Sequence, residues 1–517
     1  MFNAETFPYK YLKNKPMTSS ELSENLSNPL PDIKDIPRLK FLTMVRLGLF
    51  QMGLGMMAIL TLGILNRVMI GELGIPAIVT AGAISMHQFI APARVWFGQM
   101  SDNQPIAGKH RTNYILLGAI GFTCAVFLAV QVMWRLGALV ETNGGWLWSS
   151  ETWLWTGLLA LVFAGYGLAL SASSTPFAAL LVDVSEEHNR SKVVGVVWSM
   201  LMVGIVIGGI TGGILLKNIA DPAIVTGANL GAVLLTGQQV IPPSLETIKS
   251  PINFLFLVMP LGVFALAFIA TWGIEAKYSY YTNRSSATNR DDSITLGRAI
   301  KVLTASRQTG IFFTFLLVMT VSLFMQEAVL EPYGGEVFQM PIAATTQLNA
   351  FWGMGTLIGV STTGFLIVPR LGKQNTAKLG CGLTSLSFIL IIAAGFSQSA
   401  GLLQTVVFLF GLAAGITTTG AISLMLDLTV AATAGTFIGA WGLAQAMARA
   451  IATVSGGAVL DLGRLIFPSP VLAYSLVFAL QSVGMIVAIG LLSRVNVKEF
   501  QDSTTKTITT VLQEGLE

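Results

Sequence analysis

The chain alternates between long apolar runs and short polar connections from residue 39 to residue 493. A helix needs roughly 20 apolar residues to cross a bilayer, and the runs reach that length. The pattern therefore predicts an all-α membrane protein with twelve transmembrane helices. Their expected ranges are 39–65, 75–97, 113–135, 152–182, 192–216, 252–274, 309–332, 348–369, 377–398, 400–426, 436–460 and 470–493.

One longer polar segment, 275–308, separates the first six runs from the last six. It divides the predicted helices into an N-terminal half at 39–274 and a C-terminal half at 309–493. Polar tails flank the two halves at 1–38 and 494–517. The first tail is rich in Pro, Ser and Asn, so we expect it to be disordered. It also lacks the apolar core of a cleavable signal peptide.

Charged residues are few and unevenly distributed. They make up 11% of the 517 residues, against 53% hydrophobic residues, whereas soluble proteins carry about 25% charged residues. If the N-terminus and every second connection lie on one side, 22 of the 30 Lys and Arg residues fall there. This bias predicts that both termini are cytoplasmic. The net charge of +4 is small and forms no single stripe, so we expect no binding to nucleic acid.

Related polar turns follow several of the runs. Gly98-x-x-x-Asp102 follows the second run, and Asp183 follows the fourth. Asp427 follows the tenth run and, like Asp183, has a glycine twelve residues later. Six plus six helices with such turns resemble the major facilitator superfamily. The resemblance implies a fold of two six-helix halves that rock against each other.

The acidic residues of these turns have a physical use. An Asp at a helix boundary can accept hydrogen bonds from the next helix or pair with a basic side chain. Such contacts can hold the two halves in one conformation, as a latch does. The alternative is that each turn only connects two helices and has no role in holding a conformation. The candidate latch residues are Gly98, Asp102, Arg111, Asp183, Arg190 and Arg370.

Three arginines lie inside predicted spans, where each costs about 2.5–3.5 kcal/mol on insertion scales. Arg46 and Arg94 lie near the cytoplasmic ends of their helices, so their side chains could instead snorkel to the interface. Arg449 lies near mid-span, and Gln445 lies one turn earlier on the same face. We therefore expect Arg449 to face a central cavity. The candidate cavity or substrate-binding residues are Arg46, Gln51, Gln445 and Arg449.

Two interior residues can titrate, Glu327 and His87. Glu327 lies one turn before Glu331, which we interpret as an interface residue near the outer end of its helix. His87 lies near the middle of the second run, next to Gln88. A lone His is often a satisfied interior residue, but a neutral imidazole can also bind a metal through one nitrogen. Proton-driven transport needs a buried titratable group, and these two residues give it thin support.

The sequence contains no nucleotide-binding loop, zinc-type cluster or nucleophile motif. Cys124 and Cys381 lie far apart inside apolar runs, so they indicate neither a disulfide framework nor metal-ligand spacing. We therefore expect a protein that is not an enzyme and that holds neither a nucleotide nor a free metal ion.

Four segments carry a more specific resemblance: LGLFQMGLG at 47–55, LGILNRVMI at 62–70, HQ and PARVWFGQMSD within 87–102, and QE and LEPYGGEVF within 326–338. They resemble the bacteriochlorophyll delivery family of phototrophs, the PucC and LhaA proteins. The resemblance implies a factor that assembles light-harvesting or chlorophyll–protein complexes in a bacterial photosynthetic membrane, either thylakoid or intracytoplasmic. It makes chlorophyll or bacteriochlorophyll the expected cofactor, with His87 as a candidate magnesium ligand.

Under this resemblance the candidate cofactor-binding residues are His87, Gln88, Arg94 and Glu327. The implied partners are chlorophyll-binding antenna or photosystem subunits and pigment-synthesis proteins. Two alternatives stay open. One is a secondary transporter that moves a small or amphipathic solute by alternating access, and the other is a scaffold that needs neither cavity nor pigment.

Overall fold

The computed structural model describes residues 39–185, 190–217, 245–279, 307–428 and 434–496. All regular elements in these ranges are helices, which confirms the predicted all-α class. The N-terminal half contains α2 (Phe41–Ala58), η1 (Ile59–Leu65), η2 (Val68–Glu72), α3 (Ala77–Phe89), α4 (Ala93–Asn103), α5 (Thr112–Thr142), α6 (Ser150–Val184), α7 (Arg190–Leu216), α9 (Leu245–Thr271) and α10 (Ile274–Tyr278). The C-terminal half contains α13 (Arg307–Phe324), η4 (Met325–Ala328), α14 (Leu330–Phe338), α15 (Ile342–Thr362), η5 (Thr363–Ile367), α16 (Val368–Leu371), α17 (Lys373–Ser397), α18 (Ala400–Leu428), α19 (Ala434–Ile466) and α20 (Pro470–Ser493).

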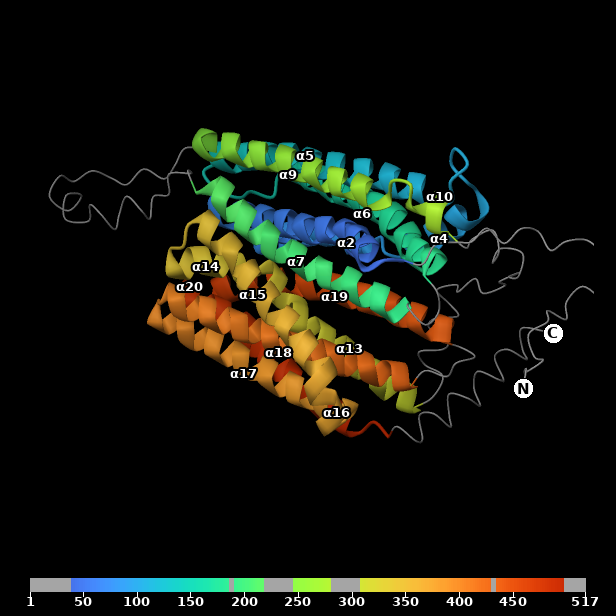
Figure 1. Ribbon diagram of the computed structural model, residues 1–517. Coiled ribbons are helices and arrows are strands. Elements are labelled where there is room, and N and C mark those ends of the chain that lie inside the picture. Colours follow the sequence, from blue (N-terminus) through green and yellow to red (C-terminus); the bar gives the residue numbers. More distant parts are fainter. Residues whose placement is uncertain (1–38, 186–189, 218–244, 280–306, 429–433, 497–517) are drawn as a thin grey trace, which may run out of the picture.

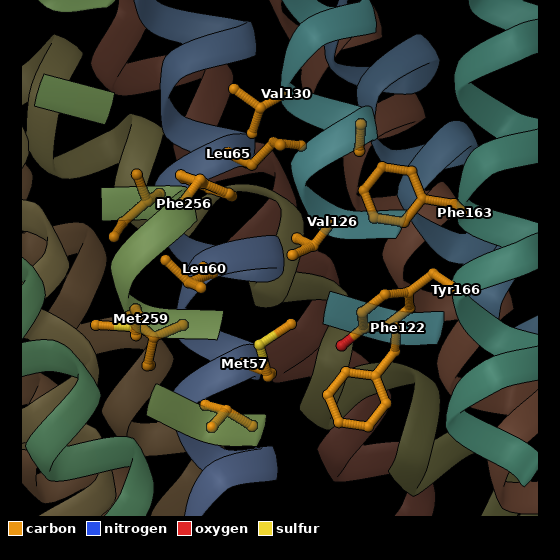
Figure 2. Packing of buried hydrophobic residues seen from close by; sticks show 14 of the residues in the cluster. Met57, Leu60, Leu65, Phe122, Val126, Val130, Phe163, Tyr166, Phe256 and Met259 are labelled. Carbon is orange, nitrogen blue, oxygen red and sulfur yellow. The ribbon is translucent and has the colours of Figure 1, made fainter. Parts of the chain in front are cut away.

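The helices form two bundles that pack against each other, blue to green and yellow to red in Figure 1. Each bundle has its own cluster of buried hydrophobic side chains. Figure 2 shows part of the first cluster, where Met57 of α2 and Leu60 of η1 lie between Met259 of α9 and Phe122 of α5. The halves meet where α7 packs on α15 and where α3 packs on α19. Any site between the halves must therefore be built from these helices and their neighbours.

Eleven helices in the described ranges are long and apolar enough to cross a bilayer, so the chain is a multi-pass integral membrane protein. The expected second span, 75–97, is not one continuous helix, and this expectation is corrected. α3 ends at Phe89 and α4 begins at Ala93. Pro92 accounts for the break, because proline has no backbone N–H and disfavours helical geometry in the residue before it.

The first helix is longer than the sequence pattern predicted. After α2 it continues through the π-helical segments η1 and η2, and the whole apolar stretch covers Phe41–Glu72. Arg67, beyond the expected end of this span, is therefore buried within it. π-helical turns are rare and are often found near functional sites.

Both ends of the described chain lie at the end of the bundle that carries the linker. Near the start, Arg46 donates to the carbonyls of Ile269 and Trp272 at the end of α9. At the other end, the Asn496 amide donates to the Gln308 side chain. We call this the linker end and the opposite one the outer end. That the linker end is cytoplasmic stays a prediction from loop charge. The predicted tails, from 1 to 38 and beyond 496, and most of the 275–308 linker lie outside the described residues.

Two helices of the C-terminal half, α15 and α18, approach each other very closely. A Cβ atom added at Gly411 of α18 would lie 3.1 Å from the Thr356 amide nitrogen and still nearer the carbonyl group of Trp352. Only glycine leaves room for two helix backbones at this separation, which is how membrane helices gain contact without a hydrophobic driving force.

Candidate functional site

An arginine–glutamate pair lies beside the interface of the two halves. Arg449 of α19 donates from Nε to Oε2 of Glu327 in η4 at 3.0 Å, and its Nη2 donates to Oε1 of the same carboxylate. The guanidinium lies over the Phe324 ring, 4.5 Å from the ring centroid. The Glu327 side chain is 9% exposed and that of Arg449 is 36% exposed. The arginine that was expected to face a central cavity thus has a bidentate partner and one open side.

His87 lies near this pair because its helix, α3, packs on α19. Its Nδ1 lies 2.5 Å from the Ile84 carbonyl oxygen. A carbonyl can only accept, so Nδ1 carries the proton and Nε2 of the neutral ring keeps a lone pair. The ring edge meets Tyr166 of α6, with 5.7 Å between ring centroids. Nε2 makes no hydrogen bond with any residue that the structure describes.

Gln88 follows His87 on α3 and is only 8% exposed. Its Oε1 is sealed from solvent and has no hydrogen-bond partner among the described residues. The same holds for the hydroxyl of Ser85, one turn earlier. Buried polar atoms normally have hydrogen-bond partners. Two neighbouring polar atoms without such partners therefore indicate a position for a water or a ligand.

Arg94 lies at the start of α4, directly after the break in the second span. Its side chain is exposed, and no carboxylate in the described ranges pairs with it. Because α3 and η4 both pack on α19, the structure brings His87, Gln88 and the Arg449–Glu327 pair into one region, and it places Arg94 on the next helix, α4.

The other proposed cavity residues lie apart from this region or form no bonds within it. Arg46 caps the carbonyl end of α9 at the linker end. Gln51 of α2 and Gln445 of α19 are both half-buried, and neither forms a side-chain hydrogen bond with another described residue. Gln445 keeps its position one turn from Arg449, so it can line the same space.

Three of the proposed latch residues, Asp102, Arg111 and Asp183, form a compact cluster. Arg111 Nε donates to Asp183 Oδ2 at 2.8 Å, and its Nη1 lies 2.6 Å both from Asp102 Oδ1 and from Ser101 Oγ. Burial disfavours the charge of Arg111, but the carboxylates of Asp183 and Asp102 outweigh it and raise the pKa of the guanidinium above its ordinary value. These partners come from α4 and α6, and Arg111 itself caps the start of α5, so the whole cluster lies in the N-terminal half.

The remaining latch residues are placed differently. Gly98 lies on α4 against Thr175 of α6, and Arg370 is exposed on α16. Arg190 begins α7, and its side chain lies outside the described part of the structure. The Glu275 carboxylate, which the sequence did not single out, accepts from the backbone amides of His110, Arg111 and Thr112 at the start of α5. A latch between the halves stays a prediction.

The outer end carries polar contacts between the halves that sequence reasoning missed. Asn66 donates to the Ala328 carbonyl at 2.8 Å. Glu331, interpreted as an interface residue, is instead buried, and its Oε1 accepts from Asn349 at 2.6 Å beside Gly63 of η1. For Glu331, the sequence signal was its spacing of four residues from Glu327, which puts both on one helical face. For Asn66 there was no signal, because the first helix continues beyond the end at residue 65 that the apolar run predicted.

Asp461 makes a second contact between the halves at the outer end. Its two carboxylate oxygens accept from the amides of Ala77 at 3.1 Å and Ile78 at 2.8 Å, at the start of α3. A carboxylate at a helix N-terminus satisfies donors that have no partner within the helix and complements its dipole. The described contacts therefore close the molecule at its outer end.

Solved structures similar to this chain are transporters. The nucleoside transporter NupG matches with a TM-score of 0.60 and 13% identity, covering 88% of this chain and 98% of its own. A bacterial homologue of the iron transporter ferroportin matches with a TM-score of 0.57 and 13% identity, covering 88% of this chain and 99% of its own. At this identity the likeness shows the fold alone, which is the predicted fold of the major facilitator superfamily.

Two curated relatives are similar over most of their length. The bacteriochlorophyll synthase 44.5 kDa chain of Rhodobacter capsulatus is 29% identical over 459 residues, which is 87% of this chain and 94% of the relative. Protein PucC of Cereibacter sphaeroides is 27% identical over 421 residues, which is 81% of this chain and 83% of the relative. The model of the PUCC protein family matches residues 64–500. Since this match covers most of the chain, the protein belongs to the PUCC protein family.

Proposed function

We propose that the protein is an assembly factor for light-harvesting or other (bacterio)chlorophyll–protein complexes in a photosynthetic membrane. It works by binding pigment and passing it on, without catalysing a reaction. The names of its relatives support this, since one is a bacteriochlorophyll synthase chain and another is a PucC protein. The single observation that carries the proposal is the state of His87.

His87 fits the magnesium ion of such a pigment. The hydrogen bond from Nδ1 to the Ile84 carbonyl fixes the tautomer and leaves the lone pair on Nε2. This is the arrangement that metal-ligating histidines usually have, so Nε2 of His87 would hold the magnesium ion of a bound pigment. The bound pigment would supply the light-absorbing macrocycle. Tyr166 fixes the plane of the imidazole, and the orphaned Gln88 amide offers a polar contact beside it.

The proposed partners follow from this role. Antenna or photosystem subunits would receive the pigment, and pigment-synthesis proteins would provide it. The exposed apolar faces of the transmembrane helices supply surface for such contacts within the bilayer.

The test is an absorption spectrum of the full-length protein purified in mild detergent from a phototrophic host. We expect co-purifying pigment, and we expect His87→Leu to reduce it without loss of the folded protein. His110→Gln is the matched control, because that ring contacts the Ser101 carbonyl in the Arg111 cluster. Absence of pigment, together with normal antenna assembly in a deletion strain, would reject the proposal.

A secondary transporter is the second candidate function, favoured by the shared transporter fold and by the Arg449–Glu327 pair near the interface. Ion pairs inside a membrane often mark a solute or proton pathway. This candidate predicts gradient-dependent flux of an amphipathic solute into proteoliposomes, lost in Glu327→Gln. Flux that is the same in that variant and in the wild type would exclude a role for the pair.

A further inference from the structure

The two halves meet at the outer end where the first helix packs on α14. A Cβ atom added at Gly63 of the first helix would lie 3.4 Å from Oε1 of Glu331 in α14. Four residues further along each helix, a Cβ added at Gly335 would overlap the guanidinium of Arg67. Each glycine therefore makes room for a charged side chain of the other half. We call this contact, made by Gly63, Asn66, Arg67, Glu331 and Gly335, the outer seam.

Several polar atoms in the outer seam are buried without partners. Asn66 is 1% exposed, Arg67 is 7% exposed and Glu331 is 3% exposed. Oδ1 of Asn66, Nε and Nη1 of Arg67, and Oε2 of Glu331 are sealed from solvent and have no hydrogen-bond partner among the described residues. Closing the outer seam therefore leaves polar atoms dry and unpaired, which costs free energy in the closed state.

Glu331 is the member of the outer seam whose charge a proton can remove. Its carboxyl group accepts from Nδ2 of Asn349 at Oε1, at 2.6 Å. Within the described ranges no basic side chain forms an ion pair with it, because Arg67, the cation of the outer seam, is instead held by Glu72, with 3.0 Å between Nη2 and Oε1. A buried carboxylate without a cation is unfavourable, so such a group takes up a proton and becomes neutral.

The helices that pack on α14 bring no other counter-ion to Glu331. α15 and α20 contain no charged residue, and the acid of α18, Asp427, lies at the linker end of that helix. Glu327 of η4 lies four positions before Glu331, but its carboxylate is paired with Arg449. Glu72 of η2 adds a negative charge, which disfavours a second carboxylate nearby.

The remaining titratable groups around α14 have partners of their own. Tyr333 donates to the Ile391 carbonyl at 2.9 Å. Tyr474 of α20 accepts from Arg464 at 3.3 Å, and the same guanidinium pairs with Glu336 at the end of α14. None of these groups supplies the positive charge that an ionised carboxylate in the outer seam would need.

We propose that Glu331 is a proton-binding site that controls the outer end. The protonated acid keeps the two halves together, and loss of the proton separates them along the outer seam. Deprotonation places a charge in the dry contact, and separation lets water reach that charge. Rising pH favours the state that binds fewer protons, which is the open one. The inference goes beyond the proposed function, because it concerns the conformation of the protein whether or not pigment is bound.

The test is a pH titration of the distance across the outer end, in the full-length protein in phosphatidylcholine nanodiscs. Spin labels are attached at Asn143→Cys and Ser399→Cys, on exposed turns of the two halves at this end, in a Cys124→Ala background. Pulsed dipolar spectroscopy should show a short distance at about pH 5 and a growing population of longer distance toward about pH 9. For one proton, the ratio of open to closed molecules should rise by up to about tenfold per pH unit.

Two variants tie this transition to the carboxyl group. Glu331→Gln should keep the short distance at every pH, because glutamine keeps the acceptor for Asn349 and has no proton to lose. Asn349→Ala should move the transition to higher pH, because it removes the hydrogen bond that stabilises the carboxylate. Glu141→Gln is the matched control and should behave as the wild type, because the Glu141 side chain is exposed at the same end.

Three results would overturn the proposal. The first is a wild-type distance that does not change with pH, a result that does not depend on whether any variant folds. The second is a longer distance at low pH, because Arg67 would then neutralise the carboxylate and hold the halves together. The third is a wild-type transition that persists in folded Glu331→Gln, because another group would then control the outer end.

Discussion

Replacing Arg111 by methionine removes the cation that holds three helices together at the linker end. The Arg111 side chain is 4% exposed and that of Asp183 is 9% exposed, so their pair is buried, whereas Asp102 is 52% exposed. Arg111→Met therefore leaves Asp183 inside the protein without this partner. Methionine keeps the length and the apolar stem of the side chain, so the change tests charge more than packing.

The structure sets the expected magnitude. Removing one partner of a buried ion pair costs up to about 3–5 kcal/mol, because the remaining charge loses a counter-ion inside the protein. Asp183→Asn is expected to cost a similar amount, and the double variant clearly less than the sum of the two, with a coupling energy of about 1.5 kcal/mol or more. Asp102→Asn is the control, and we expect it to cost about 1 kcal/mol or less because that carboxylate is half in solvent.

The assay is reversible unfolding in mixed micelles of increasing SDS fraction, with hydrogen exchange at the start of α5 to locate the change. Fast exchange should appear in Arg111→Met at the amides of Arg111 and Thr112, which depend on the same turn. If Arg111→Met and Asp102→Asn prove equally mild, or if the double variant shows simple additivity, the reasoning from burial is wrong.

Three further perturbations test the packing and the outer end. Gly411→Val should strongly reduce the thermal stability of the detergent-purified protein, because the added side chain separates α15 from α18. Gly262→Val is the control and should reduce that stability only slightly, because no atom lies within 4 Å of the added Cβ. Equal losses of stability in the two variants would contradict the close approach of α15 and α18. Asn66→Ala removes the donor to the Ala328 carbonyl and should lower the free energy of unfolding by about 1–3 kcal/mol. The amide hydrogens of η4 should then exchange faster. Unchanged exchange would show that this hydrogen bond does not stabilise η4. Asp461→Asn should speed hydrogen exchange at the Ala77 amide, because it weakens the acceptor of that amide. Protection of this amide equal to that in the wild type would contradict the prediction.

The apolar runs and the polar segment between them were enough to predict the helical class, the two halves and nearly all the spans. They failed at 75–97 and at the end of the first helix for opposite reasons. A window of hydrophobicity does not register that Pro92 interrupts a hydrogen-bond ladder. Nor does it extend a helix over Asn66 and Arg67, because it cannot see the polar partners that make their burial tolerable.

The candidate site was predictable residue by residue but not as a set of contacts. Arg449 and Glu327 stood out because charges inside a membrane need a purpose, yet they are separated by 122 positions. No periodicity connects residues at that distance, and only the packing of α19 beside η4 brings them together. The Arg111 cluster was anticipated in its members, but its partners proved to lie on neighbouring helices of one half.

The cap that Asp461 places on α3 has a consequence for how the chain is made. The cap joins residues 384 positions apart, so α3 enters the membrane long before its partner on α19 has been synthesised. Until then the amides of Ala77 and Ile78 have no acceptor from α19, and the small residues Ala77 and Ala81 have no Gly457 to pack on. The nascent N-terminal half is therefore incomplete at its outer end during translation. Its second helix can reach its final position only when the eleventh arrives.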